Sequence, residues 1–93
     1  MDEADARQTR ERSRRAQAIL QDGLVVEALA AIERRAHSAW AHSRPDDAEG
    51  REAAYRDLRA LQAFKAEFVA MIRDGQVADF DLAEIDKVRA KRA

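Results

Sequence analysis

The 93-residue sequence contains no cysteine, one proline and three glycines. The absence of cysteine excludes a disulfide framework and a thiolate zinc site, and it fits the reducing cytoplasm, where we expect the protein. Proline and glycine are the residues that most often interrupt helices. A chain nearly free of them, and rich in alanine, arginine, glutamate and leucine, therefore predicts an all-α fold.

Long hydrophobic runs and large side chains are also scarce. No apolar run approaches the roughly 20 residues that a membrane span needs, and the N-terminus lacks the apolar core of a secretory signal, so we expect neither. The aromatic residues are three Phe, one Trp and one Tyr, and many of the other apolar residues are alanines. Because alanine buries little area, the monomer should be marginal, which predicts association with copies of itself or with a partner.

Basic residues gather at the two ends of the chain, although the net charge is only −1. Residues 1–17 contain no Leu, Ile, Val or Phe, so residues 1–18 are predicted to form a basic arm. The arm is either a solvated, disordered segment or exposed helix start, or a contact for phosphates. Its arginines are Arg7, Arg10, Arg12, Arg14 and Arg15.

The second basic cluster closes the chain. Cations are favoured at a helix C-terminus, so this cluster either complements the helix dipole or contacts phosphates. Its members are Lys87, Arg89, Lys91 and Arg92.

From Ile19 to Trp40, apolar residues recur at spacings of three and four positions. The pair Asp22-Gly23 predicts a break, with Asp22 as the N-cap of an amphipathic helix that ends near Ser43. Pro45 then disfavours helical geometry before it, and Asp46 with Glu49 forms a predicted capping box. One face of this helix carries Leu29, Ile32, Ala36 and Trp40.

A second helix is predicted over residues 47–74, and it carries a heptad-like seam. Lys65 interrupts the seam, where it either snorkels or pairs with an acid on the partner helix. Gly75 follows the last periodic residue and is interpreted as a C′ glycine. Asp81 and Glu84 then predict the start of a short C-terminal helix. The seam consists of Ala54, Leu58, Leu61, Lys65, Phe68 and Ile72, widened by Phe64 and Met71.

These elements predict an antiparallel two-helix hairpin in residues 19–93, with the short C-terminal helix folded over it. Trp40 either packs in the core across the turn or anchors an interface. The apolar stripe is wide enough to serve a partner within the chain and a neighbouring subunit together, so the hairpin is expected to form a homo-oligomer. The predicted interface residues are Trp40, Leu58, Leu61, Phe64, Phe68, Met71 and Ile72.

The sequence offers little that could carry catalysis. His37 and His42 are five residues apart, whereas a helical metal site prefers four, so we expect no metal and no cofactor. The serines lack a nucleophile elbow, and no glycine-rich phosphate loop is present. We therefore expect a protein that is not an enzyme.

A recurring set of features lies between Leu29 and Gly75. Ile32-Glu33 opens a helical stretch ending in Trp40, Gly50-Arg51-Glu52 follows a loop, and an Ala-Leu-rich helix ends in Asp74-Gly75. This half of the chain resembles small helical accessory proteins of tailed phages, prophages and gene transfer agents. Within that group the closest resemblance is to a small terminase subunit.

The resemblance implies a non-catalytic protein of DNA packaging or head assembly. Small terminase subunits typically form rings through a two-helix core, bind DNA and regulate a large ATPase and nuclease subunit. No helix-turn-helix precedes the predicted hairpin here, so only weak, non-specific, salt-dependent DNA contact is expected. The expected partners are further copies of the chain, DNA, and a large terminase or another phage protein. The alternative is a phage-encoded protein–protein adaptor or inhibitor with no nucleic-acid role.

Overall fold

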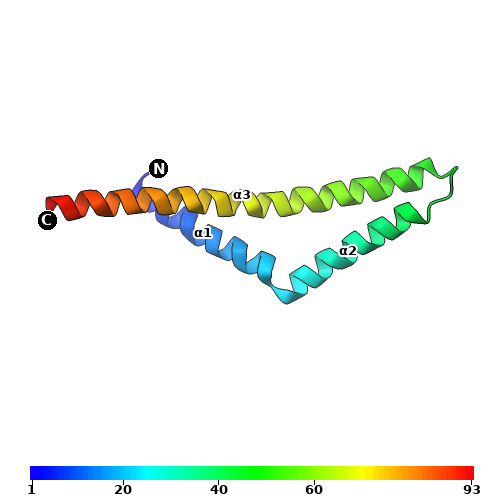
Figure 1. Cartoon of the computed structure of the whole chain (residues 1–93), viewed down its shortest axis with the longest axis horizontal. Coiled ribbons are helices and arrows are strands. Elements are labelled where there is room, and N and C mark those ends of the chain that lie inside the picture. Colours follow the sequence, from blue (N-terminus) through cyan, green and yellow to red (C-terminus); the bar gives the residue numbers. More distant parts are fainter. The chain divides into compact units, whose positions relative to one another are not determined.

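The computed structural model describes all 93 residues and contains helices, turns and no strand. The three helices are α1 (Glu3–Gln21), α2 (Gly23–Ala41) and α3 (Ala48–Arg92), as Figure 1 shows. The all-α prediction is confirmed. No helix carries an apolar stretch of the length and hydrophobicity that crossing a bilayer requires.

The break between α1 and α2 occurs at Asp22, as the sequence predicts. Asp22 has extended backbone geometry, and its Oδ1 accepts hydrogen bonds from the backbone amides of Leu24 at 2.9 Å and Val25 at 3.1 Å. These bonds satisfy two of the amides that a helix start leaves without partners. The prediction of Asp22 as an N-cap is therefore confirmed.

Residues 42–47 join α2 to α3, and the capping residue here differs from the predicted one. The backbone amide of Gly50 donates to Asp47 Oδ1 at 2.9 Å, so Asp47 caps α3 in place of Asp46. Arg51 also reaches back over the turn and donates to the carbonyl of Arg44 at 2.7 Å. Pro45 disfavours helical geometry in the residue before it. Asp47 directly precedes the first residue of α3, and this is the position from which a side chain caps a helix.

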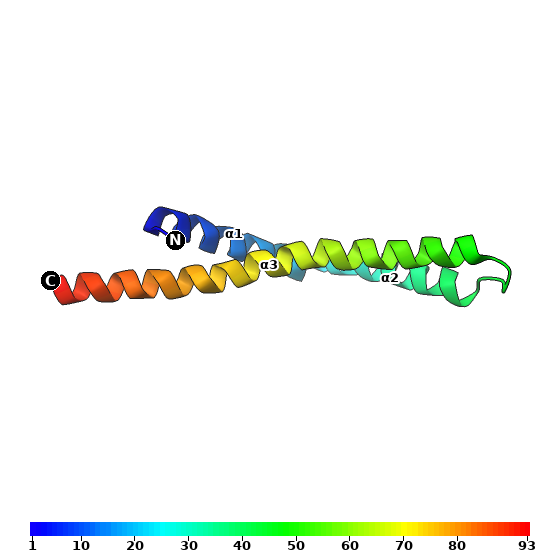
Figure 2. The same cartoon turned by 90° about the horizontal axis from the view of Figure 1, so that it is seen from above.

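The predicted helix end at Gly75 and the short C-terminal helix are wrong. Helix α3 continues without interruption through Gly75 and Asp81 to Arg92, as its unbroken ribbon in Figure 2 shows. Glycine inside a helix costs only about 1 kcal/mol relative to alanine. Packing of the second half of α3 against α1 offsets that cost, and no proline follows Gly75 to stop the helix.

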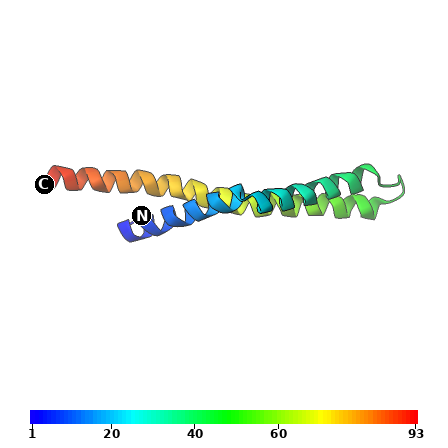
Figure 3. The same ribbon diagram turned by 90° about the horizontal axis from the view of Figure 1, so that it is seen from below.

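The chain divides into two units, one of residues 20–66 (unit 2) and the other of residues 1–19 with 67–93 (unit 1). In unit 2, α2 lies beside residues 48–66 of α3, and Figure 3 shows the two segments together. The core of this unit is small, because only Ala36, Ala54 and Leu61 are buried. Lys65 Nζ lies 3.9 Å from Glu33 Oε2, so the predicted acid for Lys65 is provided by the same chain.

In unit 1, α1 packs against residues 67–92 of α3 through small side chains. Of the alternatives for residues 1–18, the disordered arm is wrong, since this segment is helical as the helix-start alternative has it, but the helix also has a buried face. The buried face of α1 contains no Leu, Ile, Val or Phe, because α1 contacts α3 through smaller residues. The buried residues of unit 1 are Ala6, Ser13, Ala16, Gly75, Ala78 and Leu82.

The closest approach of α1 to α3 occurs where Ser13 faces Gly75. A Cβ atom placed on Gly75 would lie 2.2 Å from both Cβ and Oγ of Ser13, far inside van der Waals contact. The Ser13 hydroxyl also donates to the backbone carbonyl of Ile72 at 3.5 Å, which gives this buried polar group a partner. Glycine is thus required here by the proximity of a neighbouring helix and has no role in ending α3.

Candidate interaction surfaces

Unit 2 carries an apolar groove between α2 and α3 on its surface. The groove has a volume of about 390 Å³. Leu61, only 7% exposed, lies in its lining, while Phe64 is 48% exposed beside it. A groove with this lining suits an apolar side chain or a helix face from another chain. Its lining residues are Leu29, Ile32, Asp57, Ala60, Leu61 and Phe64.

The structure divides the seven predicted interface residues by exposure. Trp40 is 56% exposed, so its interpretation as a core residue is wrong, whereas its role as an interface anchor stays a prediction. Leu61 is buried inside unit 2 and presents almost no surface to a partner. Phe64 lies at the surface in the groove. The half-buried members of the set are Leu58, Phe68, Met71 and Ile72.

The five arginines of α1 separate into two kinds. Arg7 Nη2 lies 2.9 Å from Glu3 Oε1, and Arg10 Nε lies 4.0 Å from Asp79 Oδ1, so both cations already have carboxylate partners. Arg12, Arg14 and Arg15 are exposed and form no ion pair within the chain. Arg12 and Arg15 are three residues apart on one side of α1, where they border a shallow depression that Phe68 and Met71 also line.

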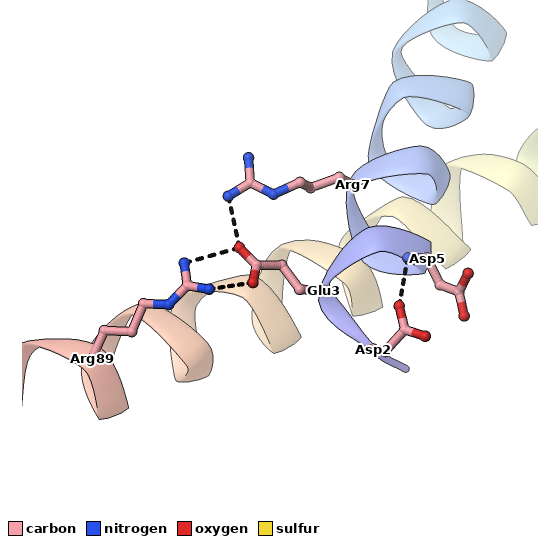
Figure 4. Close-up of polar contacts among 5 residues, drawn as sticks. All are labelled: Asp2, Glu3, Asp5, Arg7 and Arg89. Carbon is pink, nitrogen blue, oxygen red and sulfur yellow. Dashed lines mark hydrogen bonds and ion pairs between the residues drawn. The ribbon is translucent and has the colours of Figure 1, made fainter. Parts of the chain in front are cut away.

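The basic C-terminal cluster is divided in the same way. Nη1 and Nη2 of Arg89 donate hydrogen bonds to Oε1 and Oε2 of Glu3, and Oε1 also accepts from Arg7, as Figure 4 shows. Lys87 Nζ lies 3.2 Å from Glu84 Oε1. Lys91 and Arg92 are exposed and unpaired at the end of α3, where they complement the negative helix end.

The hydrogen bonds from Arg89, and then those from Arg7, hold the pKa of Glu3 below its ordinary value, and the same contact raises the pKa of Arg89. A carboxyl whose pKa is lower in the folded than in the unfolded state stabilises the fold above the unfolded pKa, which is about 4.3 for glutamate. That contribution is lost as the pH falls through the folded pKa.

We expect an NMR titration of the Glu3 side-chain carboxyl carbon to give a midpoint below the ordinary glutamate range. In Arg89→Gln the midpoint should move back toward that range, because the first and largest of its stabilising contacts is removed. Arg92→Gln, an exposed cation three residues further along the same helix, serves as the control and should leave the Glu3 titration unchanged. A Glu3 midpoint that does not respond to Arg89→Gln would contradict the ion pair.

A second exposed apolar stripe, which was not predicted from the sequence, lies on α3 within unit 1. Val69, Val77, Phe80 and Val88 are all exposed, with Phe80 66% exposed. Its spacing is visible in the sequence, but the predicted helix end at Gly75 and the predicted helix start at Asp81 place its residues on separate elements. Only the continuity of α3 places these four residues on one helix.

No group of three or more His, Asp or Glu side chains gathers in a way that could hold a metal ion. His37 Nε2 lies 3.7 Å from Glu33 Oε1 on the surface of α2, and His42 bonds Ser38 one turn back along the chain. Both histidines therefore interact with residues one turn back along the chain. The resemblance to phage packaging proteins stays a prediction, because no family model, curated protein or solved structure matches this chain.

Proposed function

We propose that this chain is a non-catalytic assembly protein that associates with copies of itself through its helices. The observation that carries the proposal is the distribution of side chains by size. Five of the seven buried hydrophobic residues are alanines, while Trp40, Tyr55, Phe64 and Phe80 are about half exposed or more. A chain that buries alanines and leaves four of its five aromatic side chains exposed gains more from association than from its own core.

The part of the chain that we expect to associate first is the antiparallel hairpin formed by α2 and residues 48–66 of α3. Its apolar groove contains Phe64 and Ile32 at the surface, and two such grooves facing each other would bury both. Hairpins of this kind commonly pair into four-helix bundles. A homo-oligomer with a hairpin core is also what the resemblance to small terminase subunits implies, and DNA packaging or head assembly is the setting that we propose for it.

The test is the mass of the full chain in solution, measured by light scattering across a range of concentrations. We expect an oligomer whose mass falls in Phe64→Ala, because the groove loses its largest exposed side chain. Gln62→Ala, an exposed position two residues away on the same helix, should leave the mass unchanged. A chain that stays monomeric at millimolar concentration would remove the proposal.

A second activity, weak contact with DNA phosphates, is favoured by the unpaired arginines of α1. Arg12 and Arg15 have no carboxylate partner in the chain, and arginine binds phosphate oxygens in a bidentate fashion. With two cations on one side of the helix, two phosphate contacts should give a salt slope near −2 on a logarithmic plot.

The chain offers a matched pair of variants for this activity. Arg12→Ala with Arg15→Ala should weaken DNA binding and flatten its salt dependence, whereas Arg7→Ala with Arg10→Ala should change neither, because those cations already face carboxylates. Both pairs are three residues apart on the same helix. If low-salt titrations with duplex DNA show no binding while the oligomer persists, the protein is an adaptor without a nucleic-acid role.

A further inference from the structure

The exposed stripe on α3 lies on the side of the helix that faces away from α1. Phe80 is two residues from both Ala78 and Leu82, which are buried against α1, so it projects about 200° around the helix from each of them. Val69, Val77 and Val88 share that outward face. Three charged residues share it: Arg73 four residues after Val69, Glu84 four residues before Val88, and Lys87, which pairs with Glu84 within the chain.

Six residues of this outward stripe follow an order in which the apolar positions are symmetric and the two charges are opposite. From the N-terminal end these six read apolar, basic, apolar, apolar, acidic, apolar, and they fall within an arc of about 100°. The arc also contains Ala70 and Lys87, which the same symmetry relates to each other as an alanine and a base. The centre of the pattern lies midway between Ala78 and Asp79. The two members of each pair lie at equal distances from that centre on opposite sides of it. The pairs are Val77 and Phe80, Arg73 and Glu84, and Val69 and Val88.

Such a pattern complements itself when two copies of the helix run in opposite directions. A two-fold axis through the centre brings Val77 against Phe80 of the other copy and Val69 against Val88, so that apolar residues meet apolar residues. The same operation brings Arg73 against Glu84 of the other copy, and it does so twice. A parallel pairing in register would instead oppose Arg73 to a second Arg73, and Glu84 to a second Glu84, which is repulsive.

We infer that the occupant of this stripe is a second copy of the same chain, docked antiparallel along α3 with its centre between residues 78 and 79. The inference rests on the proposed self-association and assigns it a second surface, distinct from the groove in unit 2. Val88 follows Val69 by 19 positions, so the contact would extend about 28 Å along the helices.

Charge exchange tests the pairing because the pattern is symmetric. In Arg73→Glu the new glutamate of each copy faces Glu84 of the other, so two acids meet at both places. In Glu84→Arg the new arginine of each copy faces Arg73 of the other, so two bases meet at both places. We expect each single variant to raise the concentration of half-association roughly tenfold, since two ion pairs become two repulsions. The double variant, with both substitutions in one chain, should restore the wild-type value, because the pairs are re-formed with their signs reversed.

Mixing the two single variants is the sharpest arm of the experiment. A chain with two acids and a chain with two bases should pair with each other as well as wild type does, although each pairs poorly with itself. Sedimentation equilibrium of the full chain, alone and in equimolar mixture, measures this at low salt, where surface charges are least screened. Glu11→Arg, the same charge change at an exposed site on α1, is the control and should leave the association unchanged.

Circular dichroism should show that the variants fold, because Arg73 and Glu84 are exposed. If wild type and all three charge variants form oligomers of the same mass with the same half-association concentration, this inference is overturned while the proposed function remains intact. A double variant as weak as the single variants would also overturn it, since charge would then act without the antiparallel register. A wild-type chain that is monomeric at millimolar concentration would end both the inference and the proposed function.

Discussion

Gly75→Ala should destabilise the protein, although alanine is the better helix former. In an exposed helix this substitution would gain about 1 kcal/mol. Here the new methyl group would lie 2.2 Å from Cβ and Oγ of Ser13, so α1 and α3 must move apart around a buried contact. Overpacking of this kind typically costs about 1–3 kcal/mol, and for a domain of this size each kcal/mol lowers Tm by about 4–8 °C.

Two companion variants separate the steric effect from helix propensity. Gly23→Ala has nothing within 4 Å of the added methyl group, so it should be neutral or slightly stabilising. Combining Gly75→Ala with Ser13→Gly removes both clashing atoms and leaves the Ser13 Cα at 3.7 Å, an ordinary contact. The double variant should therefore regain most of the stability lost in Gly75→Ala, which a double-mutant cycle would show as a strong coupling.

Hydrogen exchange adds a local measurement to the thermal one. Because Ser13 and Gly75 both belong to unit 1, amide exchange in Gly75→Ala should rise most along α1. If Gly75→Ala instead raises Tm as Gly23→Ala does, the close crossing of α1 and α3 does not exist.

Leu61→Ala should be the most damaging single truncation in unit 2. Leu61 is 7% exposed, and the other buried hydrophobic residues of that unit are Ala36 and Ala54. Burying a leucine in place of an alanine is worth about 2–5 kcal/mol in protein cores, and the open groove beside Leu61 should place the loss near the lower end of that range. The remaining core of two alanines leaves little to hold α2 against α3.

Leu24→Ala is the matched control, since it makes the same chemical change at a side chain that is 77% exposed. Its effect should stay within about 0.5 kcal/mol. Urea unfolding followed by the fluorescence of Trp40, the only tryptophan, reports on α2 directly. Both variants must be compared with wild type at one protein concentration, because association makes apparent stability concentration-dependent. Equal midpoints for the two leucine variants would contradict the burial of Leu61.

The sequence by itself determined the helical state and the places where α2 and α3 begin. The absence of proline and glycine over most of the chain leaves few alternatives to helix, and the caps at Asp22 and around Pro45 act over three or four residues. Such signals are local, so they can be found without knowing what the helix packs against. The seam through Leu58, Leu61 and Lys65 was found for the same reason.

Only the tertiary structure decided what Gly75 and the first helix do. Glycine after a periodic stretch can end a helix or admit a close neighbour, and the choice depends on Ser13, which lies far away in the sequence. The buried face of α1 could not be predicted from the sequence, because Ala6, Ser13 and Ala16 are small and give little hydrophobic signal. Small residues stabilise such a contact through the closeness of two backbones, and that closeness exists only once the helices have packed.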